Sequence, residues 1–307
     1  MSPLDCRVSI QGMLQDRDKA QAVLERYGFQ DELFYDAKFV RLTEILSSLG
    51  SVAIAYSGGV DSTFLLRVAR GVLGGKAIAV LAFSESLDRN EFEAAKETAA
   101  SLDVPVTVLE THEYENPEYR KNDGSRCYHC KSELFGEVQK YALRVGIPYV
   151  LDGSNADDVG DYRPGMRAKD ERNVRSPLLE AGLDKAEIRR FSRALGLSTW
   201  DKPAAPCLSS RIPYGSAITE EKLRQVEAAE RGLRDLGFRT CRLRHHDQLA
   251  RVEVPAEDLP RLLDPQIRSR VIEVIKGAGF LFVALDLEGF RSGSLNAALP
   301  RAGPTPS

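Results

Sequence analysis

Ser57-Gly58-Gly59-Val60-Asp61-Ser62 is the stretch of sequence that decides the fold. An apolar run at 51–56 precedes it and a helical pattern at 63–70 follows it, so the sequence predicts a strand, a loop and a helix. Paired glycines let backbone N–H groups approach an anion, the serine hydroxyls can donate to phosphate oxygens, and the helix N-terminus adds a favourable dipole. We therefore expect a polyphosphate to bind at Ser57, Gly58, Gly59, Asp61 and Ser62. The alternative interpretation is an ordinary turn between a strand and a helix.

The size and charge of the chain limit the classes of protein to consider. Its 307 residues exceed a typical single domain, so we expect a core domain with one smaller unit. A net charge of -3 gives no electrostatic reason for general nucleic-acid binding. The sequence has no apolar run long enough to span a membrane and no signal-peptide pattern at its N-terminus, so we expect a cytoplasmic protein.

Strand-like and helical patterns alternate after the opening loop, which predicts an α/β fold with a doubly wound parallel sheet. The expected strands are 77–83, 104–109 and 148–152, and the expected helices are 89–102, 132–145 and 185–195. Two further helices, 16–27 and 36–49, precede the first strand. We expect this domain to cover 16–203, after a disordered tail at 1–15.

The pattern changes after the proline-rich connector Asp201-Lys202-Pro203-Ala204-Ala205-Pro206. Helical patterns at 220–236 and up to 277 alternate with strand-like runs at 238–245, 249–254 and 280–287. This order predicts a small α+β domain at 204–298 with antiparallel pairing. The proline-rich end, 299–307, is expected to be disordered.

The carboxyl ends of parallel strands meet at one edge of a sheet, where ligands bind. Ser84 follows the second strand and Gly153 follows a later one, so both are expected at the edge that holds the phosphate loop. Asp157, Asp158 and Asp161 lie just beyond Gly153, and with Asp61 they are candidates to hold the Mg²⁺ that accompanies a triphosphate. The alternative is that these carboxylates cap or solvate a loop.

Three of the five cysteines stand in settings that suggest chemistry. Cys127 and Cys130 form a CxxC segment that precedes the expected helix at 132–145, and two such thiols can bind a metal or form a redox pair. Cys207 follows the prolines of the connector, with Arg211 and Lys202 close enough in sequence to lower a thiol pKa. By itself the CxxC is a weak signal, and a structural pair of thiols is an equal alternative.

The smaller unit carries a run of alternating charges. Arg242 and Arg244 point to one face of a strand, where they can hold a second anion, and Glu253 lies on the expected partner strand. A solvated edge strand is an alternative of similar weight.

Six segments together resemble the LarE family, the ATP-dependent sulfur transferases that mature the nickel-pincer cofactor of lactate racemase. The phosphate loop is similar to the SGGxDS loop of the PP-loop ATP pyrophosphatases, the superfamily to which LarE belongs. The other segments are RCYHCKSELF (126–135), GSNADDVGDYRPG (153–165), WDKPAAPCLSSRIPYG (200–215), RLRHHDQLARVEV (242–254) and GFRSGSLN (289–296). Their order spans nearly the whole chain.

The resemblance implies a reaction and its groups. MgATP would adenylate a carboxylate of pyridinium-3,5-biscarboxylic acid mononucleotide with loss of pyrophosphate, and a sulfur nucleophile would then displace AMP. In one subtype the cysteine matching Cys207 gives up its own sulfur and becomes dehydroalanine. In another, cysteines matching Cys127, Cys130 and Cys207 hold a [4Fe–4S] cluster whose free iron carries sulfide, and we expect this subtype because all three are present. A cluster held by three thiolates, with one iron left open, would also explain why the CxxC pair has no further metal ligands at a standard spacing in the sequence.

The same resemblance implies that Arg242 and Arg244 bind the substrate phosphate or pyrophosphate, and that Glu253 lies near a divalent metal. It also implies that the domain at 204–298 binds substrate and forms the contacts of a homo-oligomer, with a sulfide donor and cofactor-maturation proteins as partners. We further expect ligand contacts from Arg211. The rival hypotheses are a tRNA thiolase, an ammonia-using amide ligase of the same fold, and a metal-binding or scaffold protein with a vestigial loop. The first needs an RNA-binding surface, and the second leaves the three cysteines unexplained.

Overall fold

The computed structural model describes residues 36–158 and 164–291. The helix predicted at 16–27, both predicted tails, Asp161 and most of the segment 289–296 lie outside the described residues. Within the described ranges, no helix combines the length and apolarity needed to cross a lipid bilayer.

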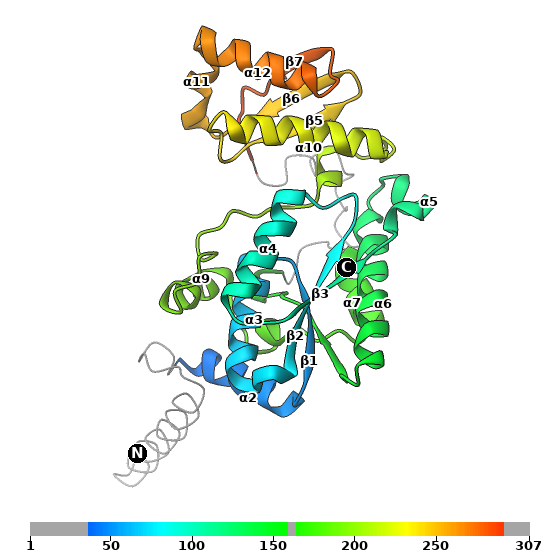
Figure 1. Ribbon diagram of the computed structural model, residues 1–307, viewed down its shortest axis with the longest axis vertical. Coiled ribbons are helices and arrows are strands. Elements are labelled where there is room, and N and C mark those ends of the chain that lie inside the picture. Colours follow the sequence, from blue (N-terminus) through cyan, green and yellow to red (C-terminus); the bar gives the residue numbers. More distant parts are fainter. Residues whose placement is uncertain (1–35, 159–163, 292–307) are drawn as a thin grey trace, which may run out of the picture.

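Four parallel strands form the central sheet of the larger unit, in the order β3-β2-β1-β4 (Figure 1). They are β1 (Val52–Tyr56), β2 (Ala77–Phe83), β3 (Val106–Glu110) and β4 (Tyr149–Leu151). In the central register Ile54 of β1 lies opposite Ala79 of β2 and Leu151 of β4. Because β1 connects to β2 on one side and pairs with β4 on the other, the order of strands reverses beside β1, where ligands bind in such sheets. The predicted α/β parallel sheet is confirmed.

Helices cover both faces of this sheet, as its doubly buried strands require. On one face lie α2 (Ala37–Leu49), α3 (Val60–Leu73), α4 (Arg89–Ser101), α8 (Pro177–Glu180) and α9 (Lys185–Ala194). Phe39, Phe64 and Phe191 pack together between three of these helices and are fully buried. On the other face, Phe135 and Val138 of α6 (Arg126–Arg144) pack on Val80 and Val150, with α7 (Pro164–Glu171) beside α6.

One predicted helix boundary is wrong. The helix expected from residue 132 begins at Arg126, so Cys127 and Cys130 lie inside the first turns of α6 rather than before it. Gly124 is the last helix-breaking residue before the segment, and nothing in 126–131 interrupts helical hydrogen bonding. A short helix, α5 (Pro117–Arg120), precedes α6. Short 3-10 turns occupy Gly74–Lys76, Glu113–Glu115 and Ala156–Asp158.

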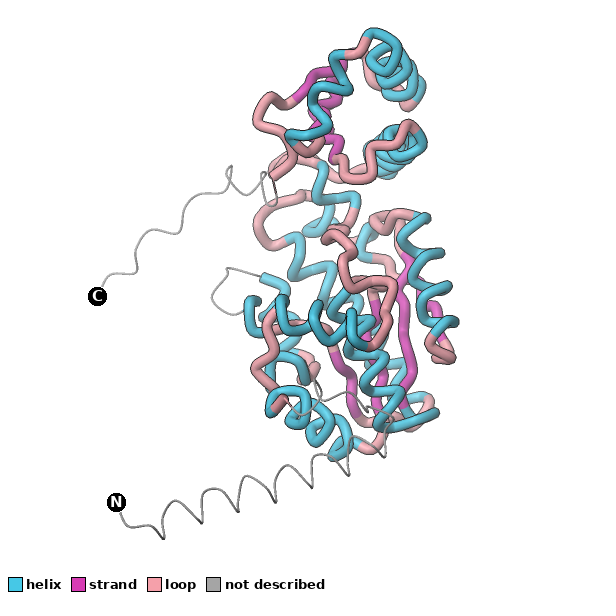
Figure 2. Tube along the Cα trace, turned by 90° about the vertical axis from the view of Figure 1, so that its left-hand side faces the viewer, coloured by secondary structure: helices cyan, strands magenta, loops and turns pink. Residues whose placement is uncertain are grey.

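The smaller unit lies at one end of the molecule, above the carboxyl edge of the large sheet (Figures 1 and 2). It contains α10 (Glu220–Asp235), β5 (Arg242–His246), β6 (Leu249–Glu253), α11 (Leu259–Leu263), α12 (Pro265–Gly277) and β7 (Phe282–Leu285), with 3-10 turns at Leu208–Arg211 and Ala256–Asp258. β5 and β6 pair antiparallel, as predicted. β7 instead pairs parallel to β6, because a helical crossover rather than a tight turn connects the two strands.

A second hydrophobic core joins the two units. Val226 and Leu233 of α10 pack with the small sheet. The same cluster includes Tyr119 of α5 and Leu208, which lies just after the connector. Cys130 is partly buried and packs against this hydrophobic cluster. The thiol segments predicted from the sequence therefore lie at the junction of the two units.

Candidate active site

The phosphate loop, residues 57–62, leaves β1 and enters the first turn of α3. Gly58 has a φ of +69°, and a Cβ on it would lie 2.5 Å from the Cβ of Ala95 in α4. The hydroxyl oxygens of Ser57 and Ser62 are 3.1 Å apart, and no side chain caps the helix at Gly59. The strand, loop and helix are confirmed as predicted, while the contacts of the loop with phosphate stay a prediction.

The segment after β4 passes directly against this loop. A Cβ on Gly153 would lie 3.0 Å from the backbone nitrogen of Ser62, so glycine permits the close approach. The Asp157 carboxylate is exposed and accepts a hydrogen bond of 3.0 Å from the backbone N–H of Lys185. The Asp158 carboxylate accepts one of 3.0 Å from the backbone N–H of Asn155. These are the contacts of the capping alternative, and a metal-binding role for either residue stays untested.

Two lysines that the sequence interpretation did not assign to the phosphate loop lie against it. The ammonium of Lys185, at the start of α9, forms an ion pair with Oδ2 of Asp61. Lys202 donates to the backbone carbonyl of Gly58 at 3.1 Å and pairs with Glu91 at 2.8 Å. Their contacts span more than 100 residues of sequence, so no local motif reveals them. The predicted effect of Lys202 on the Cys207 thiol stays untested, and the described side-chain contacts of Lys202 are with Gly58 of the phosphate loop and Glu91 of α4.

Asp61 has an oxygen suited to a metal ion. Its Oδ1 is buried and has no hydrogen-bond partner among the described residues. A carboxylate oxygen is a ligand that Mg²⁺ prefers, so the Asp61 side chain is chemically suited to bind the predicted magnesium ion.

Ser84 lies buried at the end of β2, with its hydroxyl 3.0 Å from that of Ser86. It borders a cavity of about 310 Å³ at the ends of β2 and β3, which Leu223 and Glu227 of α10 close from the smaller unit. None of the phosphate-loop residues lines this cavity. We assign the site to the phosphate loop because the anion-binding groups gather there, and a ligand contact from Ser84 stays a prediction.

The three predicted thiols lie in one neighbourhood. Burial raises the pKa of Cys130 well above its usual value, and the negative charges of Glu113, Cys207 and Cys127 raise it further. Cys127 is exposed, whereas Cys241 is buried beside α10. Among the residues described, however, no three side chains of His, Cys, Asp or Glu are close enough together to hold a metal ion. The structure gathers the thiols without forming a ligand set.

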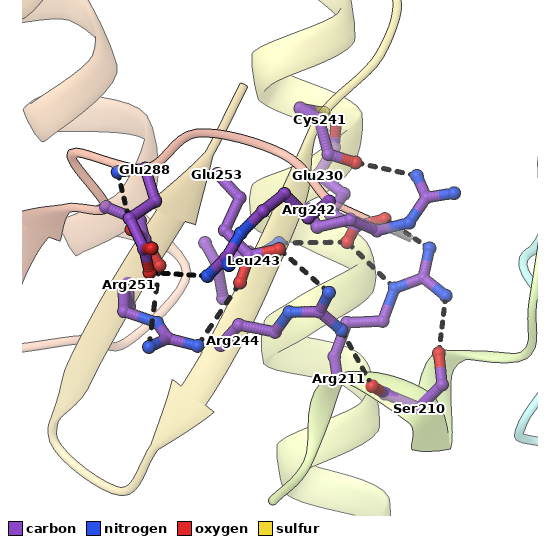
Figure 3. A network of polar contacts seen from close by, with 12 residues as sticks. Ser210, Arg211, Glu230, Cys241, Arg242, Leu243, Arg244, Arg251, Glu253 and Glu288 are labelled. Carbon is purple, nitrogen blue, oxygen red and sulfur yellow. Dashed lines mark hydrogen bonds and ion pairs between the residues drawn. The ribbon is translucent and has the colours of Figure 1, made fainter. Parts of the chain in front are cut away.

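Arginines hold the segment 204–210, which contains Cys207, by its backbone carbonyls, and Figure 3 shows the contact at Ser210. Arg211 donates to the carbonyl of Cys207 at 2.9 Å, and Arg244 donates to that of Ser210 at 2.9 Å. Arg242 donates to the carbonyl of Ala204 at 2.8 Å. The sequence predicted that Arg242 and Arg244 share a face, and both do turn toward this loop while Leu243 between them is fully buried.

Two buried carboxylates balance these arginines (Figure 3). Glu230 of α10 forms a bidentate pair with Arg211, with both distances 2.9 Å. Glu253 lies on the partner strand, as predicted, and pairs with Arg244 at 2.8 Å and Arg251 at 3.2 Å. Burial lowers the pKa of Arg242, and repulsion by Arg211 lowers it further, so this guanidinium would gain from a nearby anion. The predicted roles in substrate or metal binding are untested.

Comparison with known proteins gives relatives over most of the chain, although no family model matches it. An uncharacterized protein of Synechocystis is 46% identical over 266 residues, which cover 87% of this chain and 99% of that protein. Pyridinium-3,5-bisthiocarboxylic acid mononucleotide synthase of Lactiplantibacillus plantarum is 38% identical over 266 residues, covering 86% of this chain and 96% of that protein.

A more distant match is the tRNA-specific 2-thiouridylase of Lawsonia intracellularis, 30% identical over 48% of this chain and 50% of that protein. Together with the parallel sheet and the loop after β1, this match supports the PP-loop superfamily. The near full-length match to the synthase is more specific. The chain therefore belongs to the LarE family of PP-loop enzymes.

Proposed function

We propose that this enzyme converts a carboxylate of pyridinium-3,5-biscarboxylic acid mononucleotide into a thiocarboxylate at the cost of ATP. A carboxylate oxygen attacks the α-phosphorus and pyrophosphate leaves, which forms an acyl adenylate. A sulfur nucleophile then attacks the acyl carbon and AMP leaves. The name of the L. plantarum relative, a synthase of the bisthiocarboxylic acid mononucleotide, supports this choice of product.

The observation that carries the proposal is the path of the segment 202–211, which begins in the proline-rich connector and continues through Cys207. At its start, Lys202 donates to the phosphate loop at Gly58. In its middle, the N–H of Leu208 donates to the carbonyl of Ser86 at 2.8 Å, beyond the end of β2. At its end, Arg211 pairs with Glu230 beside Arg242. One short segment thus links an anion-binding loop, a thiol and an arginine cluster, which are the three groups that the reaction requires.

The adenylation step is assigned to the phosphate loop. Its free helix N-terminus and serine hydroxyls are suited to bind phosphate oxygens, and Asp61 is the residue that would hold Mg²⁺. That metal ion would neutralise charge on the leaving pyrophosphate. Lys185 and Lys202 add positive charge that the loop itself lacks.

The sulfur step is assigned to Cys127, Cys130 and Cys207, with a three-thiolate [4Fe–4S] cluster as the form we propose for the loaded enzyme. Among the described residues these thiols form no group close enough together to hold a single metal ion, and the cluster itself stays untested. We therefore route no step through a cluster. Sacrificial transfer from Cys207 needs no cluster and is the competing form.

Product analysis tests the adenylation step. With ATP and the biscarboxylate mononucleotide, we expect AMP and pyrophosphate, and we expect ATP–pyrophosphate exchange that depends on the carboxylate. ADP and phosphate as products would refute the assignment. Binding of tRNA that weakens with salt, without exchange on the mononucleotide, would favour the tRNA thiolase hypothesis.

A cysteine series separates the two sulfur mechanisms. If the three thiols share a cluster, Cys127→Ala, Cys130→Ala and Cys207→Ala should each lose iron and turnover, while Cys6→Ala should not. If Cys207 is sacrificial, only Cys207→Ala abolishes transfer, and the spent protein weighs about 34 Da less, the mass of H₂S. The measurements are the iron content of anaerobically purified protein and the intact mass after reaction.

We also infer a cytoplasmic homo-oligomer that works with a sulfide donor and with downstream cofactor-maturation proteins, since the family resemblance implies these partners. Light scattering of the purified protein tests the oligomer: a monomeric mass at working concentration would contradict it.

A further inference from the structure

Arg126 is a buried cation at the thiol site that the proposed mechanism has not yet used. It is the first residue of α6 and is 6% exposed. Its Nη1 donates to the side-chain oxygen of Asn122 at 2.7 Å and to the carbonyl of Ser209 at 2.9 Å. Its Nη2 lies 4.0 Å from Sγ of Cys127, and its guanidinium lies 5.3 Å from the centre of the Tyr214 ring.

These neighbours are all uncharged in their ordinary states. Within residues 36–158 and 164–291, no carboxylate forms an ion pair with Arg126, although Arg211 and Arg244 nearby each have one. A buried charge without a counter-charge is costly, so such a group is normally paired. Burial by itself lowers the pKa of Arg126, while negative charge at Cys207, Cys127 and Tyr214 and the contact with the Cys127 thiol raise it, with a net upward direction. Of the groups in contact with Arg126, the thiol of Cys127, 4.0 Å from Nη2, ionises most readily, so the available counter-charge is on sulfur.

Arg126 also fixes the position of the sulfur site. The side-chain nitrogen of Asn122 donates to the carbonyls of Ile212, Pro213 and Ser216, at 3.1, 2.8 and 2.9 Å. Asn122 is fully buried and has a φ of +55°, which asparagine adopts more readily than most residues. Through Ser209 and Asn122, the start of α6 is joined to the 3-10 turn that follows Cys207 and to the segment after that turn.

We propose that Arg126 is the fixed cation of the thiol site, and that it holds an anionic sulfur group, a thiolate, persulfide or hydrosulfide, between Cys127 and Cys207. This role rests on the proposed sulfur transfer. Because the guanidinium is anchored by two hydrogen bonds, its charge is in place before sulfur arrives. Arg126 is thus a positioning residue for the sulfur donor and not part of the adenylating loop.

The test compares two alkylating reagents of similar size on the resting protein, without ATP or substrate. Iodoacetate is an anion and iodoacetamide is neutral, and both attack the same thiolate, so the ratio of their rates at Cys127 reports the local charge independently of thiol ionisation. Peptide mass spectrometry gives the ratio at this exposed thiol. We expect the iodoacetate-to-iodoacetamide ratio to be about three- to tenfold higher in the native protein than in urea.

Variants separate charge from structure. Arg126→Gln should lower the native ratio to that of the unfolded chain, while Arg126→Lys keeps it within about twofold of wild type. Arg144→Gln removes the same charge from the exposed last turn of α6 and should leave the ratio unchanged. An unchanged ratio in folded Arg126→Gln would overturn the proposal.

The comparison does not depend on either variant or on turnover. If Arg126→Gln does not fold, equal ratios in native and urea-unfolded wild-type protein would still overturn the proposal. Failure of the proposed function appears elsewhere, as absence of AMP and pyrophosphate, and leaves the alkylation ratio unaffected.

Discussion

The ammonium of Lys185 lies against Oδ2 of Asp61, although the two residues are 124 positions apart in the chain. The other carboxylate oxygen, Oδ1, is buried and has no hydrogen-bond partner among the described residues. One carboxylate therefore faces a lysine on one side and a position suited to a cation on the other. A divalent ion bound there would share Asp61 with Lys185 and bring a second positive charge to the phosphate loop.

Asp61→Asn should suppress adenylation, because an amide cannot supply the negative oxygen that a magnesium ion needs. We expect a fall of about 100-fold in pyrophosphate release. The matched control is Asp103→Asn. It removes an exposed carboxylate that pairs with Arg70, a residue of α3, the helix that also contains Asp61, and it should change the rate less than twofold. Equal rates for Asp61→Asn and wild type would remove Asp61 from the mechanism.

Gly58→Ala should disrupt the phosphate loop. The new Cβ would lie 2.5 Å from the Cβ and 2.9 Å from the Cα of Ala95, at a φ of +69° that alanine tolerates poorly. Gly50→Ala is the control, since Gly50 has a φ of +72° but no atom within 4 Å of the added Cβ. Both variants should lose about 1 kcal/mol of stability from the backbone conformation. Only Gly58→Ala should lose more and should also lose ATP binding, as measured by thermal unfolding with and without ATP.

Changing both Arg242 and Arg244 to Ala should raise the KM for the mononucleotide while leaving ATP binding nearly intact. Each lost charge-assisted contact costs about 1.5 to 3 kcal/mol, roughly a tenfold effect or more. Arg239→Ala, just before β5 and exposed, controls for the loss of positive charge. If kinetics stay unchanged in a folded double variant, these arginines act only in buried structural contacts, Arg244 in its ion pair with Glu253 and Arg242 in its hydrogen bond to the carbonyl of Cys241 (Figure 3).

Cys241 should make the protein sensitive to alkali. Burial raises the pKa of this thiol to about 12, with a further contribution from Glu230. Since the unfolded chain releases the proton near pH 9, the stabilising effect of the neutral buried thiol is complete below that pH and declines as pH rises toward 12.

The free energy of unfolding should therefore fall by about 1 kcal/mol per pH unit in this range from Cys241 alone. Cys241→Ala removes this slope, although it is less stable at every pH because of the cavity left behind. Urea unfolding at pH 8, 9 and 10 measures how the free energy of unfolding changes with pH. An identical slope in wild type and Cys241→Ala would contradict the prediction, and Cys127→Ala, which changes an exposed thiol, is the control.

The sequence predicted the parts of the fold that rest on local patterns. Alternation of apolar and helical runs predicted the parallel sheet, because each strand of such a sheet is apolar on both faces. The start of α6 was missed because residues 126–131 are polar and carry no apolar period, and what anchors them is the contact of Arg126 with a distant loop. The parallel pairing of β7 was missed because strand direction depends on how the chain crosses over, which the strand itself does not encode.

The candidate site was predicted in the same uneven way. The residues of the phosphate loop are contiguous, so their type and spacing were informative. Lys185 and Arg126 became visible only in three dimensions, because a lysine at the start of a helix and an arginine beside a CxxC are ordinary sequence features. Their importance comes from burial and from partners far away in the chain.

The shared core between the units limits how the chain can be divided. Tyr119 comes from the larger unit and Leu208 lies just after the connector, yet each is 1% exposed because helix α10 covers the cluster that contains them. A fragment ending before residue 204 would leave Tyr119 uncovered beside the CxxC turns. The two units should accordingly melt together in one cooperative transition. The junction that holds the thiols would then be lost at the same temperature as the phosphate loop.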